Sequence, residues 1–550
     1  MKLFAHAREI SIILLLSTLM ACGGGNSNTT TTPPTVTTVS PKNGLTGVLN
    51  NSVLSITFSE DIDATTLTST SFTLSGSSPV SGTIAYDAST RTASFTPDTP
   101  LSLNIEHIIT LTTDVMDSAG NALTEVYTSR FTTEPFIRKV SENPSGVVGN
   151  DHSFTPSINA DGRYVAFTSR ATNLVNNDLN GTWDIFRHDI QTGVLTRVSV
   201  DSTGLEKSDG RSYFPTISGD GRYVVFNSSS SGLVSGDTNA ALDIFRHDTQ
   251  TGATIRVSVD SAGVEGNGIS SGKTAAAISA DGRYVVFESQ ATNLVSGDTN
   301  ATSDIFRHDT QTGTTTRVNV DSTGTEANGT SIQPAISSDG RYVVFRSNAS
   351  NLIGGDTNGT ADIFRHDTKT GTTTRVNVDS TGTEANGTSQ TPAISADGRY
   401  VVFKSSASNL VIGDTNGRID IFRHDVQTGI TIRVSVDSAG VEGNNSSTLP
   451  RISDNGRYVI FSSDATNLVS NDTNSAPDIF SYDTQTSTII RVNVTSTNAE
   501  DNPSGKGDGN PAISGDGRYV VFDTDGTNLS PGGDGNGFDA DVFRVLNTTP

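Results

Sequence analysis

A repeated tetrapeptide, Asp-Gly-Arg-Tyr, constrains the fold of this chain more than any other feature of its sequence. A second motif, Asp-Ile-Phe-Arg-His-Asp, follows each copy and weakens only in the last two. Such a repeat indicates one supersecondary unit copied seven times, with each copy stacked on its neighbours. The copies are 58 to 61 residues apart and begin at Asp161, Asp220, Asp281, Asp339, Asp397, Asn455 and Asp516.

Each unit divides into four strand-like runs, as the fourth copy illustrates. An Asp-Gly turn joins residues 334–337 to 342–345, and a long loop leads to 362–366. Gly371 then turns the chain into a threonine-rich run, 372–378, that suits a solvent-exposed edge. The Tyr-Val-Val-Phe run is apolar on both faces, as expected where sheets stack face to face. Seven such units predict an all-β fold that contains a seven-bladed β-propeller with four-stranded blades.

The seventh unit lacks a fourth strand, and a candidate for it lies before the first unit. This unit stops after its third strand, 541–546, whereas 137–141 matches the fourth strands of the other units. Pairing of the two segments would close the ring and remove its exposed edges. We therefore expect one closed propeller over 135–550. The repeat resembles the TolB-type, WD40-like propeller family, which implies the fold but leaves the function open.

Residues 35–134 carry a different pattern, in which short strand-like runs alternate with turns. Several runs alternate apolar and polar residues, which is typical of half-buried strands. A segment of this length built from such strands predicts an Ig-like β-sandwich. The segment resembles the SbsA-type bacterial Ig-like family, which implies a spacer or stalk on a bacterial surface. The resemblance rests on residues 39–41, 56–60 and 117–121.

The first residues have the features of an export signal. A basic start precedes an apolar run, 10–20, that is too short to span a bilayer. The run ends in Leu-Met-Ala-Cys22, which resembles the bacterial lipobox, although a methionine stands where a smaller residue is usual. The resemblance implies that 1–22 is a lipoprotein signal peptide and that Cys22 carries the lipid; an ordinary signal peptide is the alternative. Residues 23–34 then form a flexible tether, and Gly23 favours the outer membrane.

Composition excludes several classes of partner and site. The chain has 59 acidic and 36 basic side chains, a net charge of −23, which argues against nucleic acid as a partner. A single cysteine excludes a disulfide framework and any cysteine-based zinc site.

The loops between the second and third strands repeat the pattern Asp-x-Asn-x-x-x-Asp. Oxygen ligands at the first, third and seventh positions of a short loop suit Ca²⁺, although a fourth carboxylate is missing. The alternative is that these residues form Asx turns that start the next strand. The candidate calcium ligands are Asp178, Asn180, Asp184, Asp237, Asn239, Asp243, Asp298, Asn300, Asp304, Asp356, Asn358, Asp362, Asp414, Asn416, Asp420, Asp472, Asn474 and Asp478.

Catalytic motifs are not evident in this sequence. Five histidines occupy one equivalent strand position, so ring symmetry spreads them apart and favours a packing role over a catalytic triad. The blade-connecting loops repeat Glu-x-Asn, as at Glu265 and Asn267, and these side chains offer either a ligand surface or ordinary solvated loops. We therefore predict a protein that is not an enzyme.

A unique binding site in a duplicated scaffold should involve residues that break the repeat. Unselected drift of the loops would give the same asymmetry and is the alternative. The residues that depart from the pattern on the expected loop face, and are our binding-face candidates, are Trp183, Glu206, Arg211, Tyr213, Lys273 and Arg418.

Together these features predict an exported lipoprotein, lipid-anchored at the bacterial cell envelope, with a binding or scaffolding role. The propeller would present its loop face on an Ig-like stalk to an envelope or extracellular protein or to a glycan. Two alternatives stay open: a periplasmic, Tol-like partner of envelope proteins, and a propeller enzyme acting on polysaccharide or peptide.

Overall fold

A computed structural model shows two compact units, with the boundary between Pro135 and Phe136. Apart from one short 3-10 helix, Ala64–Thr66, the regular elements are β-strands, so the expectation of an all-β chain is confirmed. In the part of the chain that is described, no helix is long and apolar enough to cross a membrane. The structure describes residues 32–207, 209–271, 274–474, 476–503, 509–529, 536–537 and 539–549.

The first unit is a sandwich of two sheets. Their described strand pairs are antiparallel except for β2 with β9, which is parallel. Alternate residues point inward, as in β3, where Leu54, Ile56 and Phe58 are buried and the residues between them are half-buried. One sheet has the order β1 (Val36–Ser40), β3 (Leu54–Phe58), β7 (Thr92–Pro97), β6 (Gly82–Asp87). The other has the order β2 (Leu45–Val48), β9 (Tyr127–Thr133), β8 (Glu106–Leu111), β4 (Phe72–Ser75), β5 (Pro79–Val80).

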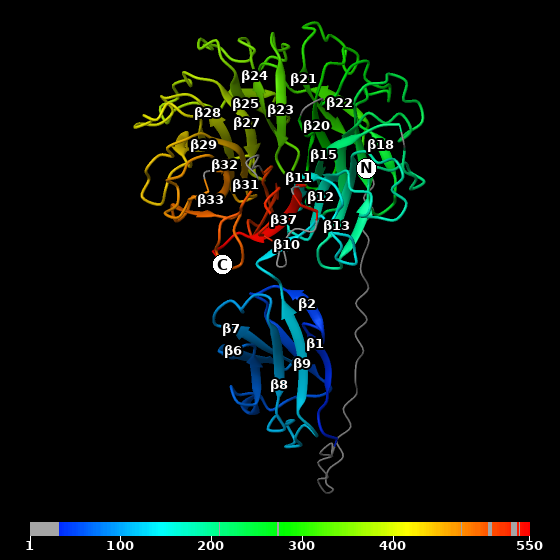
Figure 1. Ribbon diagram of the computed structural model, residues 1–550, viewed down its shortest axis with the longest axis vertical. Coiled ribbons are helices and arrows are strands. Elements are labelled where there is room, and N and C mark those ends of the chain that lie inside the picture. The colour runs from blue at the N-terminus through cyan, green and yellow to red at the C-terminus, as the bar shows by residue number, and fades with distance from the viewer. Residues whose placement is uncertain are drawn as a thin grey trace, which may run out of the picture. The chain divides into compact units, whose positions relative to one another are not determined.

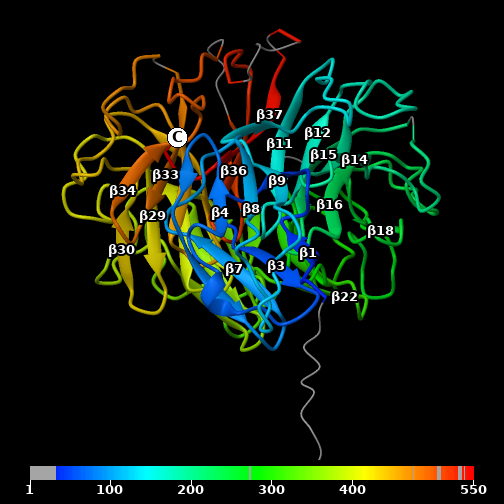
Figure 2. The same ribbon diagram turned by 90° about the horizontal axis from the view of Figure 1, so that it is seen from below.

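The described residues of the second unit form seven four-stranded sheets, arranged as the blades of a propeller (Figures 1 and 2). We number the blades in chain order. Blade 1 contains β11 (Ser153–Ile158), β12 (Tyr164–Ser169), β13 (Asp184–Asp189) and β14 (Val194–Arg197); blade 2 contains β15 (Ser212–Ile217), β16 (Tyr223–Ser228), β17 (Asp243–Asp248) and β18 (Thr254–Arg256). Blade 3 contains β19 (Ala277–Ile278), β20 (Tyr284–Ser289), β21 (Asp304–Asp309) and β22 (Thr314–Arg317); blade 4 contains β23 (Ser331–Ile336), β24 (Tyr342–Ser347), β25 (Asp362–Asp367) and β26 (Thr372–Arg375). Blade 5 contains β27 (Ser389–Ile394), β28 (Tyr400–Ser405), β29 (Asp420–Asp425) and β30 (Ile430–Arg433); blade 6 contains β31 (Ser447–Ile452), β32 (Tyr458–Ser463), β33 (Asp478–Asp483) and β34 (Thr488–Arg491).

The two ends of the repeat region close the ring in blade 7, as the sequence predicted. Strand β10 (Ile137–Lys139) pairs antiparallel with β37 (Asp541–Leu546), and Ile137 lies opposite Val545. The buried Lys139 ammonium also donates to the Asp541 carboxylate at 2.7 Å. Blade 7 is completed by β36 (Tyr519–Thr524) and β35 (Ala512–Ile513), so residues about four hundred positions apart share one sheet.

Blades pack face to face through the second and third strands of each repeat. In β24, Val343 and Phe345 pack toward blade 3, whereas Val344 packs toward blade 5, and all three are fully buried. Phe345 also stacks on Phe364 of β25, with ring centroids 6.0 Å apart. Complete burial of such side chains contributes roughly 1.5–3 kcal/mol each. The two-sided apolar strand of the repeat is therefore explained by its two packing surfaces.

The repeated Asp-Gly-Arg-Tyr turn locks each blade to the next. Tyr342 of blade 4 packs on Gly398 of blade 5, where an added Cβ would lie 2.1 Å from the ring. Arg365 places its guanidinium 3.7 Å from the Tyr342 ring centroid and donates to the Gly398 carbonyl at 3.0 Å. Arg341 forms two hydrogen bonds to Asp367, at 2.8 and 2.6 Å. Residues of both sequence motifs thus serve the contacts that build and join the blades.

Candidate functional site

Each long loop between the second and third strands contributes to a repeated group of charged side chains that we call the rim cluster. In blade 4 it consists of Asp356, Asp362, Arg375 and Glu384, all buried or nearly so. Nη1 of Arg375 lies 2.7 Å from Glu384, 3.1 Å from Asp362 and 3.6 Å from Asp356. An arginine from the last strand therefore lies among three carboxylates.

The same rim cluster recurs in the first six blades, each with one arginine and three acids. In blade 7, Lys139 replaces the arginine and pairs with Asp541. The arginines of the six clusters are Arg197, Arg256, Arg317, Arg375, Arg433 and Arg491. The acid groups are Asp178, Asp184 and Glu206; Asp237, Asp243 and Glu265; Asp298, Asp304 and Glu326; Asp356, Asp362 and Glu384; Asp414, Asp420 and Glu442; and Asp472, Asp478 and Glu500.

The asparagine of each loop makes hydrogen bonds that shape the loop itself. Oδ1 of Asn358 accepts from the backbone N–H of Thr360 at 2.8 Å, which is an Asx turn. Nδ2 of Asn358 donates to Asp362 and to the Ala385 carbonyl, at 3.0 and 2.9 Å. Asn180, Asn239, Asn300, Asn416 and Asn474 make the same turn. The asparagine oxygens expected as cation ligands therefore accept backbone hydrogen bonds.

Three acids around one arginine leave each rim cluster with an excess of negative charge. Burial, together with the nearby Asp184 charge, raises the pKa of Asp178 to about 6. Burial likewise raises the pKa of Asp472 to about 6. Within the described part of the chain, one oxygen each of Asp178, Asp298 and Asp472 is buried without a hydrogen-bond partner. The acids are close enough to hold a metal ion, yet the arginine already lies between them.

The repeated histidines are packing residues in this structure. His247, His308, His366 and His424 each place Nδ1 2.8 to 2.9 Å from the hydroxyl of a threonine in the neighbouring strand. His188 lies 2.8 Å from the Val140 carbonyl, and burial lowers its pKa to about 4. Neutral, buried rings spread over five blades do not converge on one site, as the sequence indicated.

Of the described binding-face candidates, Trp183 and Tyr213 lie together, whereas Arg418 belongs to the distant blade 5. Trp183 packs between Phe154 and Tyr213, with ring centroids 4.7 and 6.3 Å away. The side chains of Arg211 and Arg418 are exposed. Glu206 lies in a rim cluster, 2.8 Å from Arg197. Lys273 and Cys22 lie outside the described residues.

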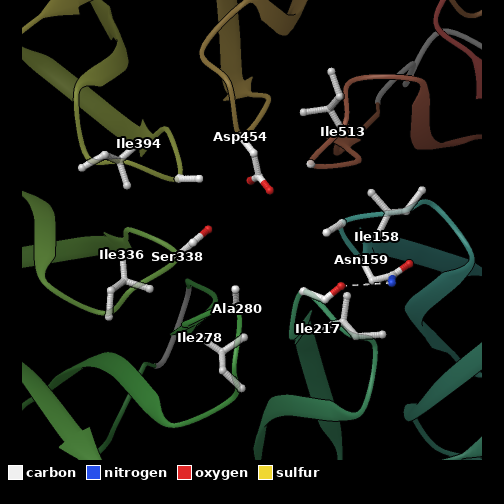
Figure 3. Close-up of a pocket in the computed structure, with 14 residues that line it drawn as sticks. Ile158, Asn159, Ile217, Ile278, Ala280, Ile336, Ser338, Ile394, Asp454 and Ile513 are labelled. Carbon is white, nitrogen blue, oxygen red and sulfur yellow. Dashed lines mark hydrogen bonds between the residues drawn. The ribbon is translucent and has the colours of Figure 1, made fainter.

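At the end of the propeller that carries the Asp-Gly turns, hydrogen bonds between neighbouring blades form a ring around the central tunnel, which we call the collar. Backbone N–H groups donate to carbonyls of the next blade around the whole ring, for example Ala280 to Ser338 at 3.0 Å and Ser338 to Ala396 at 3.0 Å. Isoleucines such as Ile336 and Ile394 line the collar, and Asp454 points into its opening (Figure 3). The equivalent residues in the other blades are alanine, glycine or serine. The cavity at the collar has a volume of about 150 Å³.

A larger cavity of about 350 Å³ lies beside the collar, on the side of the long loops. Its wall is made by the first strand of each blade, and in blades 1, 2, 4, 5 and 6 this strand bulges where a residue with positive φ precedes a proline. Thr391 and Leu449 are two such residues, with φ of 48° and 53°. Phe214, the prolines and Arg451 also line it. We call this cavity the tunnel mouth. Its lining is partly apolar and includes one charged group, the Arg451 guanidinium.

One strand position beside this cavity differs in every blade. It follows the phenylalanine of the second strand and precedes a repeated serine, or threonine in blade 7, and it has the same register in all seven sheets. We call it the variable position. From blade 1 to blade 7 it is occupied by Thr168, Asn227, Glu288, Arg346, Lys404, Ser462 and Asp523.

The acids at the variable position have partners, whereas the bases form no ion pair in the described part of the chain. Glu288 accepts from the backbone N–H of Gln333 in the next blade at 3.2 Å, and Asp523 accepts from that of Thr155 at 3.2 Å. Among the described residues, no ion pair involves Arg346 or Lys404. Arg451 donates to the carbonyl of its neighbour, Pro450, at 2.9 Å, and forms no ion pair with the described residues. Three adjacent blades, 4 to 6, thus contribute bases without counter-ions.

Sequence reasoning did not select these residues, because it looked for asymmetry in the loops and not within the strands. The signal was present in the sequence. Each second strand reads Tyr-Val-(Val, Ala or Ile)-Phe-x-(Ser or Thr), and x is a different residue in each copy. Aligning the seven copies and asking where charge changes sign would have found Glu288, Arg346, Lys404 and Asp523.

Comparison with known proteins identifies the first unit. Residues 30–133 match the family model of the bacterial Ig-like domain, which confirms the predicted Ig-like fold. The matched region is a minor part of the chain. No curated protein matches this sequence.

Solved structures that resemble the chain are propellers with low sequence identity. An oligogalacturonate lyase in complex with manganese is 14% identical over 74% of this chain and 92% of its own, with a TM-score of 0.47. The propeller domain of the Trilobed protease from Pyrococcus furiosus is 12% identical over 72% and 96%, with a TM-score of 0.42. TolB from Acinetobacter baumannii is 15% identical over 75% and 78%, with a TM-score of 0.36. These similarities carry no inference about activity or ligand.

Proposed function

We propose that this chain is an exported cell-envelope lipoprotein with a non-catalytic binding role, and that the tunnel mouth receives the ligand. The bacterial Ig-like domain supports a place at the envelope, where it would serve as a spacer. The observation that carries the binding role is a set of three bases: Arg451 lines the cavity, and Arg346 and Lys404 occupy the variable position of the two preceding blades. None of the three forms an ion pair among the described residues. Unpaired charge beside a cavity is suited to a ligand of opposite charge.

The contacts that the acids and histidines make favour a binding role over catalysis. Glu288 and Asp523 accept backbone hydrogen bonds and belong to blades that are not neighbours. The repeated histidines are buried against threonines, away from one another. A general acid–base pair would need two such groups facing one substrate atom. The described tunnel residues do not provide that arrangement, so the enzyme alternative has less support than the binding role.

The first test concerns the anchor and the location of the propeller. The full chain is expressed in a Gram-negative host that is fed an alkyne palmitate analogue, and labelling is compared with that of Cys22→Ser. Intact cells are then treated with protease, and released peptides from 136–546 are identified by mass spectrometry. Label on the native chain alone supports the lipoprotein proposal, whereas equal label on both chains overturns it. Released peptides place the binding face outside the cell, and protection favours a periplasmic, Tol-like partner.

Calcium binding remains a separate prediction, and the rim clusters are the place where the ion would bind. Three carboxylates are a suitable donor set for Ca²⁺, and the unpartnered oxygen of Asp178 could accept another cation contact. The arginine fits the group poorly, because Arg197 lies 2.8 to 3.6 Å from all three acids and would have to move. Thermal unfolding in Ca²⁺ and in EDTA tests the prediction: a midpoint that rises with Ca²⁺ supports it, and identical midpoints exclude it.

A further inference from the structure

We propose that the tunnel mouth is a binding site for a compact organic anion with two or more carboxylates, held by Arg346, Lys404 and Arg451. The proposal rests on the binding role argued above and adds the chemical class of the ligand. It begins from the variable position, where one register of the sheet carries a different side chain in each blade. The basic members of that set are next to one another in the ring.

The register fixes where the bases lie. Glu288, at the variable position of blade 3, reaches the backbone N–H of Gln333 in the first strand of blade 4. Arg346 and Lys404 occupy the same register in blades 4 and 5. They therefore lie beside the first strands of blades 5 and 6, where Thr391 and Leu449 line the cavity.

Two further observations place the bases close together and leave them without partners. The pKa of Lys404 is lowered by burial and by the charge of Arg346, so the two cations are near enough to repel. Nε of Arg346 is buried and has no hydrogen-bond partner in the described residues. Oε1 of Gln333 accepts from the backbone N–H of Thr391, so this amide oxygen is also engaged.

The electrostatic setting argues for a specific site and not for a general attraction. The whole chain has a net charge of −23, which disfavours the general approach of anions. Burying part of an unpaired arginine or lysine costs solvation free energy, and a bound anion would offset that cost. The collar carries Asp454 at its opening, so the negative end of a ligand would be held at the mouth and not drawn deeper.

The cavity limits the size and the body of the ligand. A volume of about 350 Å³ is at the small end of sites for organic molecules. Phe214, Pro334 and Pro392 give part of its wall an apolar surface, which suits a short carbon skeleton. Guanidinium groups bind carboxylates through paired hydrogen bonds, and an ammonium group adds a point charge. Three bases from three blades match a molecule with two or three carboxylates.

Calorimetric titration of the full chain with tricarballylate tests the proposal, with its neutral triamide as the ligand control. The test variant is Arg346→Gln with Lys404→Gln. The control variant is Lys42→Gln with Lys369→Gln, which removes two exposed positive charges that do not line the cavity. We expect tricarballylate to bind the native chain and the control equally. We expect the test variant to bind about tenfold to a hundredfold more weakly.

Several results would overturn the proposal: no binding of tricarballylate at millimolar concentration, equal binding to the test variant, or equal binding of the triamide. Pyrophosphate in a separate titration distinguishes the two common sources of clustered anionic oxygens, and a higher affinity for pyrophosphate would overturn the carboxylate assignment. Melting curves show whether the variants are folded. These measurements use the purified protein, so a negative result leaves the palmitate and protease experiments, and the envelope role that they test, unaffected.

Discussion

Arg375 and Arg346 belong to the same blade, yet their surroundings differ completely. Arg375 lies in a rim cluster with Glu384 and Asp362 at 2.7 and 3.1 Å, and its counterparts in five other blades do the same. Arg346 has no carboxylate partner among the described residues, and the equivalent residues range from Thr168 to Asp523. The arginine that repeats with the scaffold thus takes part in the ion pairs of the blade, whereas Arg346, which does not repeat, forms none in the described part of the chain.

The largest expected effect comes from substituting Arg375, the arginine of the rim cluster. Arg375→Met leaves Asp356, Asp362 and Glu384 buried without their cation, and loss of one partner from a buried ion pair costs about 3–5 kcal/mol of unfolding free energy. Urea unfolding followed by circular dichroism measures the loss. Arg346→Met is the matched control from the same blade and should change the unfolding free energy by less than about 1 kcal/mol. Equal losses in the two variants would mean that Arg346 is also structural, and the contrast would fail.

A smaller effect is expected at the blade-joining turns. Gly340→Ala adds a Cβ 2.1 Å from the Tyr284 ring at a φ of +74°, so it combines backbone strain with a clash between blades. Gly371→Ala has nearly the same φ, +75°, but its Cβ would meet no atom within 4 Å. We expect about 1 kcal/mol of destabilisation for Gly371→Ala and about 2–4 kcal/mol for Gly340→Ala. Thermal melts of both variants check the difference, and equal losses would show that the Tyr–Gly contact adds nothing.

The excess acid of a rim cluster predicts a stabilising substitution that depends on pH. Burial raises the pKa of Asp178 from 3.8 to about 6, so below that value the native state holds the proton more tightly than the unfolded state. This contribution to stability is lost as pH rises through 6. Asp178→Asn removes the ionisation and should add about 1–2 kcal/mol at pH 8, with the gain declining toward pH 4. Unfolding at pH 8, 6 and 4 tests the trend, and a gain that is constant with pH would contradict it.

The sequence was sufficient for the fold because its informative residues are local and repeated. The Asp-Gly turn, the two-sided Tyr-Val-Val-Phe strand and the match of 137–141 to other fourth strands each specify one contact, and copying made them unmistakable. The rim cluster was only half visible. Asp356 and Asp362 share a loop, but Arg375 and Glu384 come from a later strand and the next blade connection, and only the fold brings them together.

The tunnel bases were missed for a related reason. Neighbouring copies are separated by 58 residues at Arg346 and Lys404, and no local motif includes both. Their proximity follows from the ring, which places equivalent strands side by side around one axis. The loop residues chosen instead, such as Trp183 and Arg418, depart from the repeat but are separated by several blades. Asymmetry therefore locates a site only when it is combined with the register of the sheets.

The smallest expected effect on the free energy of unfolding concerns Lys404, at the variable position of blade 5. Lys404→Met removes a half-buried cation that is repelled by Arg346 and has no acidic partner in the described chain. The unfolding free energy should stay within about 0.5 kcal/mol of the native value or rise slightly, because no ion pair is broken and an unfavourable charge is removed. Lys404→Glu places an acid beside Arg346 and should stabilise the chain by up to about 1 kcal/mol. If either variant instead loses more than 2 kcal/mol, Lys404 supports the blade, and variation at this position would reflect seven separate packing solutions and not a site kept for a ligand.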